Sequence, residues 1–222
     1  MPPRSTDPHL RERIIATAAR LLATEGAVSA RRLARELGTS TMVVYTHFGG
    51  MDELSRQVMR RGFVGFGTEL DSGAVTDDAV ADWMTYLWNY RRFALREPHL
   101  YAVMFGPGLA EFRTGDPADL EAARFTFVSL LRRIHACVNA GRWEVDDVTT
   151  AGEAVWSGVH GHTTLEHTGF FGAVGRDPVR SYSEILTRMS MGLGDDARST
   201  ARSLSTSRRR AVRADRAEVA TS

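Results

Sequence analysis

Apolar residues recur every three or four positions along almost the whole chain, and this spacing constrains the fold more than any other feature of the sequence. Between residues 9 and 24, for example, Ile14 and Leu21 lie on the same side of a helix. Stretches that alternate between apolar and polar residues, as strands do, are short and lack hairpin turns. We therefore expect an all-α protein.

The helical segments are short at the start of the chain and longer after residue 76. Gly26 and Gly38 end the first two segments, and Ser29 is a good N-cap for the second. The longer helices are expected over residues 77–96, 98–105, 117–140, 145–168 and 179–191. We therefore expect an N-terminal arm over residues 1–8, a three-helix domain over 9–55 and a larger helical bundle over 56–194.

The last segment, residues 195–222, contains almost no large apolar side chains. Most of its residues are Ser, Thr, Arg and Ala, so it cannot bury enough apolar surface to stay folded by itself. We expect a disordered basic tail, with a marginal helix over residues 208–219 as the alternative.

The segment from Ser29 to Phe48 has the spacing of a helix-turn-helix. Its first helix packs through Leu33 and Leu37, and Gly38 allows the sharp turn. Val44 then holds the second helix against the core, so the opposite face and the N-terminus stay free. A free face of this kind can enter the major groove of DNA. The alternative is a tight helical hairpin that belongs to an ordinary core.

The predicted DNA contacts are the side chains that this packing leaves outside. Hydroxyl and amide groups at the start of the second helix suit a phosphate or a base edge, and Met42 and Val43 suit a thymine methyl group. Tyr45 and His47 suit backbone phosphates beside the groove. The full set of predicted DNA-binding residues is Ser29, Arg31, Ser40, Thr41, Met42, Val43, Tyr45, Thr46 and His47.

Positive charge gathers at the two ends of the chain. Residues 1–61 hold ten arginines and six acidic residues, residues 62–194 hold eleven and seventeen, and residues 195–222 hold seven and four. All of these cations are arginines, because the sequence contains no lysine. A basic N-terminal region followed by an acidic region is typical of a protein that binds phosphate groups with one face. Charge alone does not exclude an ordinary enzyme.

Other features argue against a membrane protein, a secreted protein or an enzyme. No apolar run is long enough to cross a bilayer, and residues 1–10 lack the apolar stretch of a signal peptide, so we expect a soluble cytoplasmic protein. Cys137 lies on an apolar stretch and is interpreted as a core residue. No catalytic motif is present, so we expect no catalytic residues, no cofactor and no enzyme activity.

The residues from Val28 to Ser40, followed by Tyr45-Thr-His-Phe48 and Asp52-Glu-Leu54, resemble the N-terminal signature of the TetR family of repressors. The resemblance implies a homodimer with recognition helices over residues 40–46. The chain departs from the pattern at Met51, where members commonly have a lysine, and at Gly49-Gly50, which replaces proline and serine. A phosphate anchor is therefore missing, and DNA affinity depends more on the arginines.

Residues 76–194 are rich in large aromatic side chains. Core packing is the ordinary explanation for each one alone, but together they exceed what five helices need. They predict a cavity for a flat or apolar organic effector. The candidate ligand-binding residues are Trp83, Tyr86, Tyr101, Met104, Phe105, Phe127, Trp156 and His160.

The segment from Ala154 to Gly161, with Leu165-Glu166, resembles the Trp-His-Gly motif of one TetR subgroup, and the resemblance extends to about Leu193. In such proteins the last two large helices form the dimer interface, which here corresponds to residues 145–168 and 179–191. Gly158 and Gly161 would let another helix approach closely.

Four side chains, His160, His162, Glu166 and His167, invite a metal-binding interpretation. Only His162 and Glu166 have helical i,i+4 spacing, and no cysteine or second histidine pair completes a site. Structural or ligand-bonding histidines fit better, and we expect no metal.

The favoured function is a repressor that a small effector releases from palindromic double-stranded operator DNA. Three alternatives stay open: a helical ligand-binding protein or enzyme whose N-terminal unit is structural, a DNA-binding regulator that has lost its ligand, and activation instead of repression.

Overall fold

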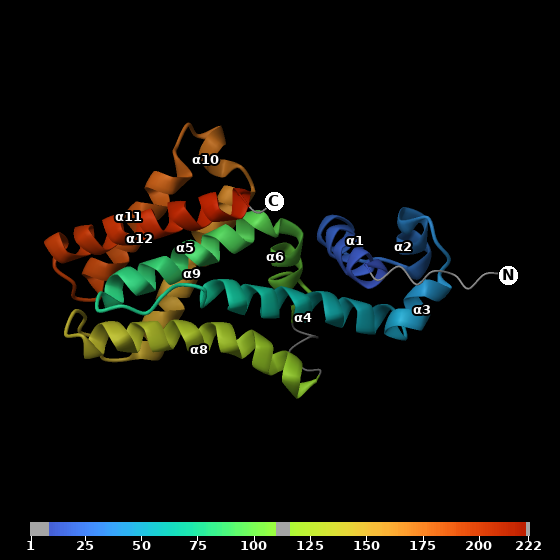
Figure 1. Ribbon diagram of the computed structural model, residues 1–222, viewed down its shortest axis with the longest axis horizontal. Coiled ribbons are helices and arrows are strands. Elements are labelled where there is room, and N and C mark those ends of the chain that lie inside the picture. Colours follow the sequence, from blue (N-terminus) through green and yellow to red (C-terminus); the bar gives the residue numbers. More distant parts are fainter. Residues whose placement is uncertain (1–8, 110–115, 221–222) are drawn as a thin grey trace. The chain divides into compact units, whose positions relative to one another are not determined.

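The computed structural model describes residues 9–109 and 116–220, and they contain helices and no strand, as the sequence predicts (Figure 1). The expected N-terminal arm lies outside the described residues. The helices are α1 (Leu10–Glu25), α2 (Ala30–Leu37), α3 (Met42–Phe48), α4 (Met51–Leu70), α5 (Ala79–Arg96), α6 (Pro98–Met104), α8 (Pro117–Asn139), α9 (Val148–His167), α10 (Phe170–Ala173), α11 (Pro178–Gly192) and α12 (Ala197–Val219).

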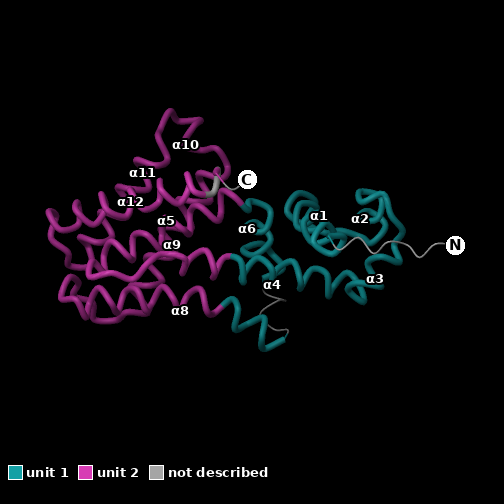
Figure 2. The backbone as a smooth tube through the Cα atoms, in the orientation of Figure 1, with its two compact units in different colours: residues 1–65, 97–123 teal, residues 66–96, 124–222 magenta. Residues whose placement is uncertain are grey.

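The chain forms two compact units, each made of two separate segments (Figure 2). Unit 1 comprises residues 1–65 and 97–123, and unit 2 comprises residues 66–96 and 124–222. This division differs from the expected boundary between residues 55 and 56. The reason is that α4 is one unbroken helix across that point, and that α6 packs against α1.

The core of unit 1 is apolar and is contributed by the first four helices. Ile14, Leu21, Leu33 and Leu54 are fully buried in it. Two local features set the ends of α2, because the Ser29 hydroxyl accepts a hydrogen bond from the Arg32 amide and Gly38 adopts a left-handed conformation with φ of 64°. A side chain at Gly38 would strain this turn, so the sequence fixes the turn between α2 and α3 locally.

Unit 2 is built around α5, which is buried on nearly all sides, from Val80 to Tyr90. The helices α9 and α12 pack on it, and α11 packs on both α9 and α12. From α8, the Thr126 carbonyl accepts a hydrogen bond from the Tyr86 hydroxyl at 2.7 Å. A helix that is buried all round needs neighbours on every side, and α12 supplies one of them.

The prediction that residues 195–222 form a disordered tail is wrong, because residues 197–219 form α12. The face of α12 that packs inward carries small polar side chains, and Thr200, Ser203 and Ser207 are fully buried. Such residues stabilise a helix only when each finds a hydrogen-bond partner. The sequence alone does not reveal those partners.

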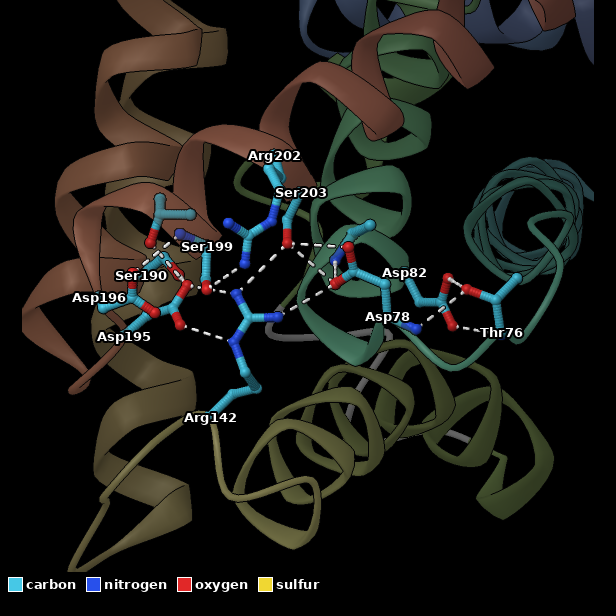
Figure 3. Close-up of polar contacts among 12 residues, drawn as sticks. Thr76, Asp78, Asp82, Arg142, Ser190, Asp195, Asp196, Ser199, Arg202 and Ser203 are labelled. Atoms are coloured by element: carbon cyan, nitrogen blue, oxygen red, sulfur yellow. Dashed lines mark hydrogen bonds and ion pairs between the residues drawn. The ribbon is translucent and has the colours of Figure 1, made fainter.

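The partners of Thr200 and Ser203 are acidic side chains of unit 2 (Figure 3), whereas Ser207 donates to the Leu204 carbonyl of its own helix at 2.9 Å. Thr200 donates to Asp195 Oδ2 at 2.6 Å, and Ser203 donates to Asp78 Oδ1 at 2.9 Å. Arg142 donates to both oxygens of Asp195, at 2.7 and 2.8 Å. Burial opposes ionisation of Asp195, but the hydrogen bonds from Arg142 and Thr200 outweigh it and lower the pKa of this carboxyl. The network therefore contains a buried carboxylate that remains charged.

Candidate functional site

The short helix α3 separates its side chains into a buried and an exposed face. Val44 and Phe48 are 1% and 6% exposed and belong to the core of unit 1. On the opposite face Met42 is 64% exposed and Tyr45 is 53% exposed. Large side chains are rarely left in water without a function when several lie together, so this face is available for a partner.

The structure gives the other predicted DNA-contact residues different roles. Ser40 is exposed, and Thr41 is the N-cap of α3 although its side chain makes no capping bond. Thr46 is exposed, but its hydroxyl donates to the Met42 carbonyl at 2.8 Å. Ser29 caps α2 and thus has a structural task.

Two further predicted contacts, Val43 and His47, are half-buried. Val43 packs against the core of unit 1, and the His47 ring lies 6.3 Å from that of Phe48. The predicted residues therefore lie on α3, just before it and at the start of α2, and Met42 and Tyr45 are the exposed large side chains among them.

The arginines of α2 differ in their partners. Arg32 forms ion pairs with Glu25 at 2.8 Å and Glu36 at 2.6 Å. Arg31 and Arg35 are exposed, and no carboxylate among the described residues lies within ion-pair distance of either. Arg35 was not among the predicted contacts, although its position four residues after the predicted contact Arg31 places both on one face.

Met51, which stands where relatives commonly carry a lysine, is the first residue of α4. It is partly buried and packs against the core of unit 1. The departure from the family pattern therefore replaces a potential phosphate contact by a packing contact.

An aromatic cluster surrounds Trp156 in unit 2. The Trp156 ring lies edge-on to Tyr90, Phe127 and Phe66, with centroid distances of 5.4, 6.0 and 6.2 Å. Tyr90 also shares a hydrogen bond of 2.9 Å with His160 Nδ1. Burial lowers the pKa of His160, so this imidazole is neutral near pH 7. The cluster combines flat apolar faces with polar groups, as sites for organic ligands do.

Two other candidate ligand-binding residues of unit 2 have partners of their own, and three candidates lie in unit 1. Trp83 packs edge-on against Trp143 with centroids 4.9 Å apart, and Tyr86 is fixed to α8 by its hydroxyl group. Tyr101, Met104 and Phe105 belong to unit 1.

The three candidates of unit 1 pack against other residues of that unit. Phe105 lies against Tyr101 and Phe63, and Met104 is fully buried against Gly62. The cluster consists instead of three predicted residues, Phe127, Trp156 and His160, together with Tyr90 and Phe66. The position of Tyr90, four residues after Tyr86 on α5, was a signal that could have identified it.

A pocket of about 660 Å³ lies within unit 1 and contains none of the eight candidate ligand-binding residues. The last turn of α1, the start of α4 and the segment after α6 line it, with Leu22, Met51, Arg56, Met59 and Val103 among the lining side chains.

The histidines of α9 do not form a metal site. Glu166 is held by Arg91, whose Nε donates to Glu166 Oε2 at 2.7 Å, and His162 is buried with its ring stacked on Phe171. Within the described ranges no three His, Cys, Asp or Glu side chains could hold a metal ion together.

Two glycines of α9 differ in their surroundings. A Cβ atom at Gly158 would come within 2.2 Å of Met189 Cε, so α11 approaches α9 closely there, as expected. Gly161 has nothing within 4 Å of such an atom.

Among the helices that the structure describes, none is long and apolar enough to cross a membrane.

Two family models match the chain. The model described as "Bacterial regulatory proteins, tetR family" matches residues 14–58, and the model described as "Tetracyclin repressor-like, C-terminal domain" matches residues 83–189. No curated protein matches the sequence closely enough to count as a relative.

Solved structures share the fold. A regulatory protein of the tetR family from Rhodococcus RHA1 aligns with a TM-score of 0.69 and 20% identity, over 84% of this chain and 97% of the other. The TetR family transcriptional regulator PfmR from Thermus thermophilus aligns with a TM-score of 0.60 and 22% identity, over 68% and 85%. RolR in complex with resorcinol aligns with a TM-score of 0.53 and 18% identity, over 89% and 92%. With its helix-turn-helix in unit 1 and both family models matched, the chain belongs to the TetR family of bacterial transcriptional regulators.

Proposed function

We propose that the protein is a ligand-responsive repressor, which binds a palindromic operator through α3 and is released by a small organic effector. The exposed face of α3, with Met42 and Tyr45 in solvent, is the observation that carries this proposal. Arg31 and Arg35 add positive charge beside it, because neither is neutralised by a carboxylate of the described residues. A regulator of this kind works in the cytoplasm, where its DNA lies.

The effector site that we propose is the cluster around Trp156. Its ring faces suit a flat organic molecule, and Tyr90 and His160 supply polar groups that a hydroxyl-bearing ligand could use. RolR, which shares the fold, was solved with resorcinol, a flat compound with hydroxyl groups. Trp156, His160 and Gly161 also support membership of the Trp-His-Gly subgroup.

Dimerisation through α9 and α11 follows the expectation for such a regulator. Leu165 on α9 and Met191 on α11 are 44% and 45% exposed, and Gly161 faces open space. Exposed apolar residues and a glycine on neighbouring helices suit close packing against a second copy. Two copies would present two recognition helices to successive major grooves.

Release by the effector requires that it bind the DNA-free conformation more tightly than the DNA-bound one. A ligand that bound both equally would leave the operator occupied, so the proposal needs a measured difference in affinity and not ligand binding alone.

The decisive experiment measures binding of the purified protein to labelled DNA from immediately upstream of its own gene, with competitor DNA present. We expect saturable binding that is lost in Tyr45→Ala and retained in Tyr101→Phe, a control in unit 1 that keeps the buried ring. If no such fragment is bound and selection from random DNA also fails, α3 does not recognise an operator.

The effector is tested in the same assay with a panel of flat phenolic compounds that includes resorcinol. A compound that releases the wild-type protein from DNA should not release Trp156→Ala. An unchanged response in that variant would remove Trp156 from the effector site.

A further inference from the structure

Five arginines form a continuous line along the outer face of α12. Successive members are separated by four, seven, four and three residues, and each of these spacings is close to a whole number of helical turns. All five are exposed. These residues, which we call the arginine stripe, are Arg198, Arg202, Arg209, Arg213 and Arg216.

The arginine stripe lies opposite the face by which α12 packs. Thr200, Ser203 and Ser207 on the inner face are fully buried, and Arg210 also turns inward, where its Nη1 donates to Asp82 Oδ1 at 2.7 Å. Figure 3 shows the contact of Ser203 with Asp78 on the inner face, and Arg202 of the stripe beside Ser199. The packing of α12 thus uses one face completely and leaves the other to solvent.

Among the residues that the structure describes, no carboxylate forms an ion pair with the arginine stripe, and Asp196 acts on Arg202 only as a nearby charge. Three acidic residues in and beside α12 have other partners: Asp195 pairs with Arg142, Asp215 lies 3.8 Å from Arg92, and Asp196 accepts a hydrogen bond from the Ser199 amide at 3.0 Å. Neighbours of the stripe in the sequence supply neutral acceptors: Arg202 donates to the Ser199 hydroxyl at 2.7 Å, and Arg209 donates to the hydroxyls of Ser205 at 2.7 Å and Thr206 at 3.1 Å. Such bonds can hold a guanidinium in place without removing its charge.

The dimensions and chemistry of the stripe fit a polyanion with regularly spaced charges. Eighteen residues of helix, from Arg198 to Arg216, span about 27 Å at 1.5 Å per residue. Duplex DNA carries one phosphate charge per about 1.7 Å of its axis, and guanidinium groups bind phosphate in a bidentate manner. An anionic membrane would favour a helix with many apolar residues beside the cations, whereas Val212 is the only large apolar residue of α12 that is exposed in the described chain.

We propose that the arginine stripe of α12 is a second DNA-contact surface, which binds the phosphate backbone of double-stranded DNA independently of sequence. It acts in addition to α3 and does not require that α3 recognise an operator. Because DNA phosphates hold cations that the stripe would displace, its contribution falls steeply with salt concentration.

The test uses the full-length protein and a labelled duplex of arbitrary sequence, about 30 base pairs long, with affinity measured by fluorescence anisotropy over a range of salt concentrations. The stripe variant is Arg209→Gln with Arg213→Gln. The control is Arg124→Gln with Arg132→Gln, two exposed arginines of α8 whose replacement removes the same charge. Glutamine is a good helix former, and circular dichroism checks that both variants keep the wild-type helix content.

We expect the stripe variant to bind the duplex about tenfold more weakly at low salt, and the slope of log affinity against log salt to fall by about two for each bound chain. The control should change the slope much less. Equal losses in both variants would assign the effect to overall charge and overturn the proposal. The proposal would also be overturned if the stripe variant bound the duplex as the wild-type protein does but bound vesicles of anionic lipid more weakly.

Tyr45→Ala, measured in parallel, separates this proposal from the operator proposal. Loss of operator binding only in Tyr45→Ala, with an unaffected stripe variant, would overturn the stripe alone. Loss of arbitrary-duplex binding in the stripe variant would support the stripe even if Tyr45→Ala had no effect on any DNA.

Discussion

The helices α3 and α12 both expose one face to solvent, but different interactions hold their inner faces in place. In α3 the inner side chains, Val44 and Phe48, are apolar and enter a core of other apolar residues. In α12 the inner side chains bear hydroxyl groups, and Ser203 and Thr200 donate to Asp78 and Asp195. Apolar packing needs only burial, whereas a polar face needs each partner in the right place, so the two helices should respond differently to substitution and to pH.

We expect the largest loss of stability for Asp195→Ala, because this change leaves the Arg142 guanidinium without its main partner. Removing one member of a buried ion pair costs about 3–5 kcal/mol of the free energy of unfolding. Urea denaturation measures this loss, and hydrogen exchange should locate it in α12 and α5. The exposed residue Asp146, changed to Asn, is the matched control. A loss below about 1 kcal/mol, the range of surface pairs, would show that the network does not hold α12.

Leu33→Ala should have the next largest effect, and in the other unit. Leu33 is fully buried in the core of unit 1, and removing its side chain costs about 2–5 kcal/mol. Faster hydrogen exchange should appear in α2 and α3 while α12 stays protected. Equally faster exchange in α12 would mean that the two units unfold together, and the comparison between α3 and α12 would then fail.

A smaller effect is expected from pH, through His160 and His162 of unit 2. Burial is the main cause that lowers the pKa of both, and for His162 the Glu166 carboxylate opposes it while Arg91 adds to it. The unfolded chain therefore takes up protons first as pH falls, so the stabilisation is complete above the ordinary histidine pKa of about 6.5 and is lost below it.

The free energy of unfolding falls by at most about 1.4 kcal/mol per pH unit for each proton that the unfolded chain takes up. His162→Phe, which can keep the stacking on Phe171, should flatten the dependence between pH 7.5 and 5.5 in thermal or urea unfolding. The same slope in the variant and the wild-type protein would show that His162 does not contribute.

The prediction for unit 1 succeeded where the signals were local. The spacing of Leu33, Leu37 and Val44, the cap at Ser29 and the glycine at Gly38 all act within a few residues of one another. The helix-turn-helix and the all-α class followed from them and are confirmed.

The prediction for the effector site was limited by a property of helices. A buried aromatic stripe has the same spacing whether it faces a core or a ligand, so Trp83 and Tyr86 could not be distinguished from Trp156. The position of Tyr101 in unit 1 could not be predicted for a different reason, because α6 packs on α1, which is distant in the sequence.

The sequence by itself therefore determined the helix-turn-helix, the turns between the first three helices and the long helices between residues 77 and 191, because periodicity and capping depend on near neighbours. Only the tertiary structure decided that residues 197–219 are ordered and that Trp156, Tyr90 and His160 meet. Ser203 and Arg142 are satisfied by Asp78 and Asp195, which are distant from them in the chain, and the three-dimensional fold is what brings those partners together.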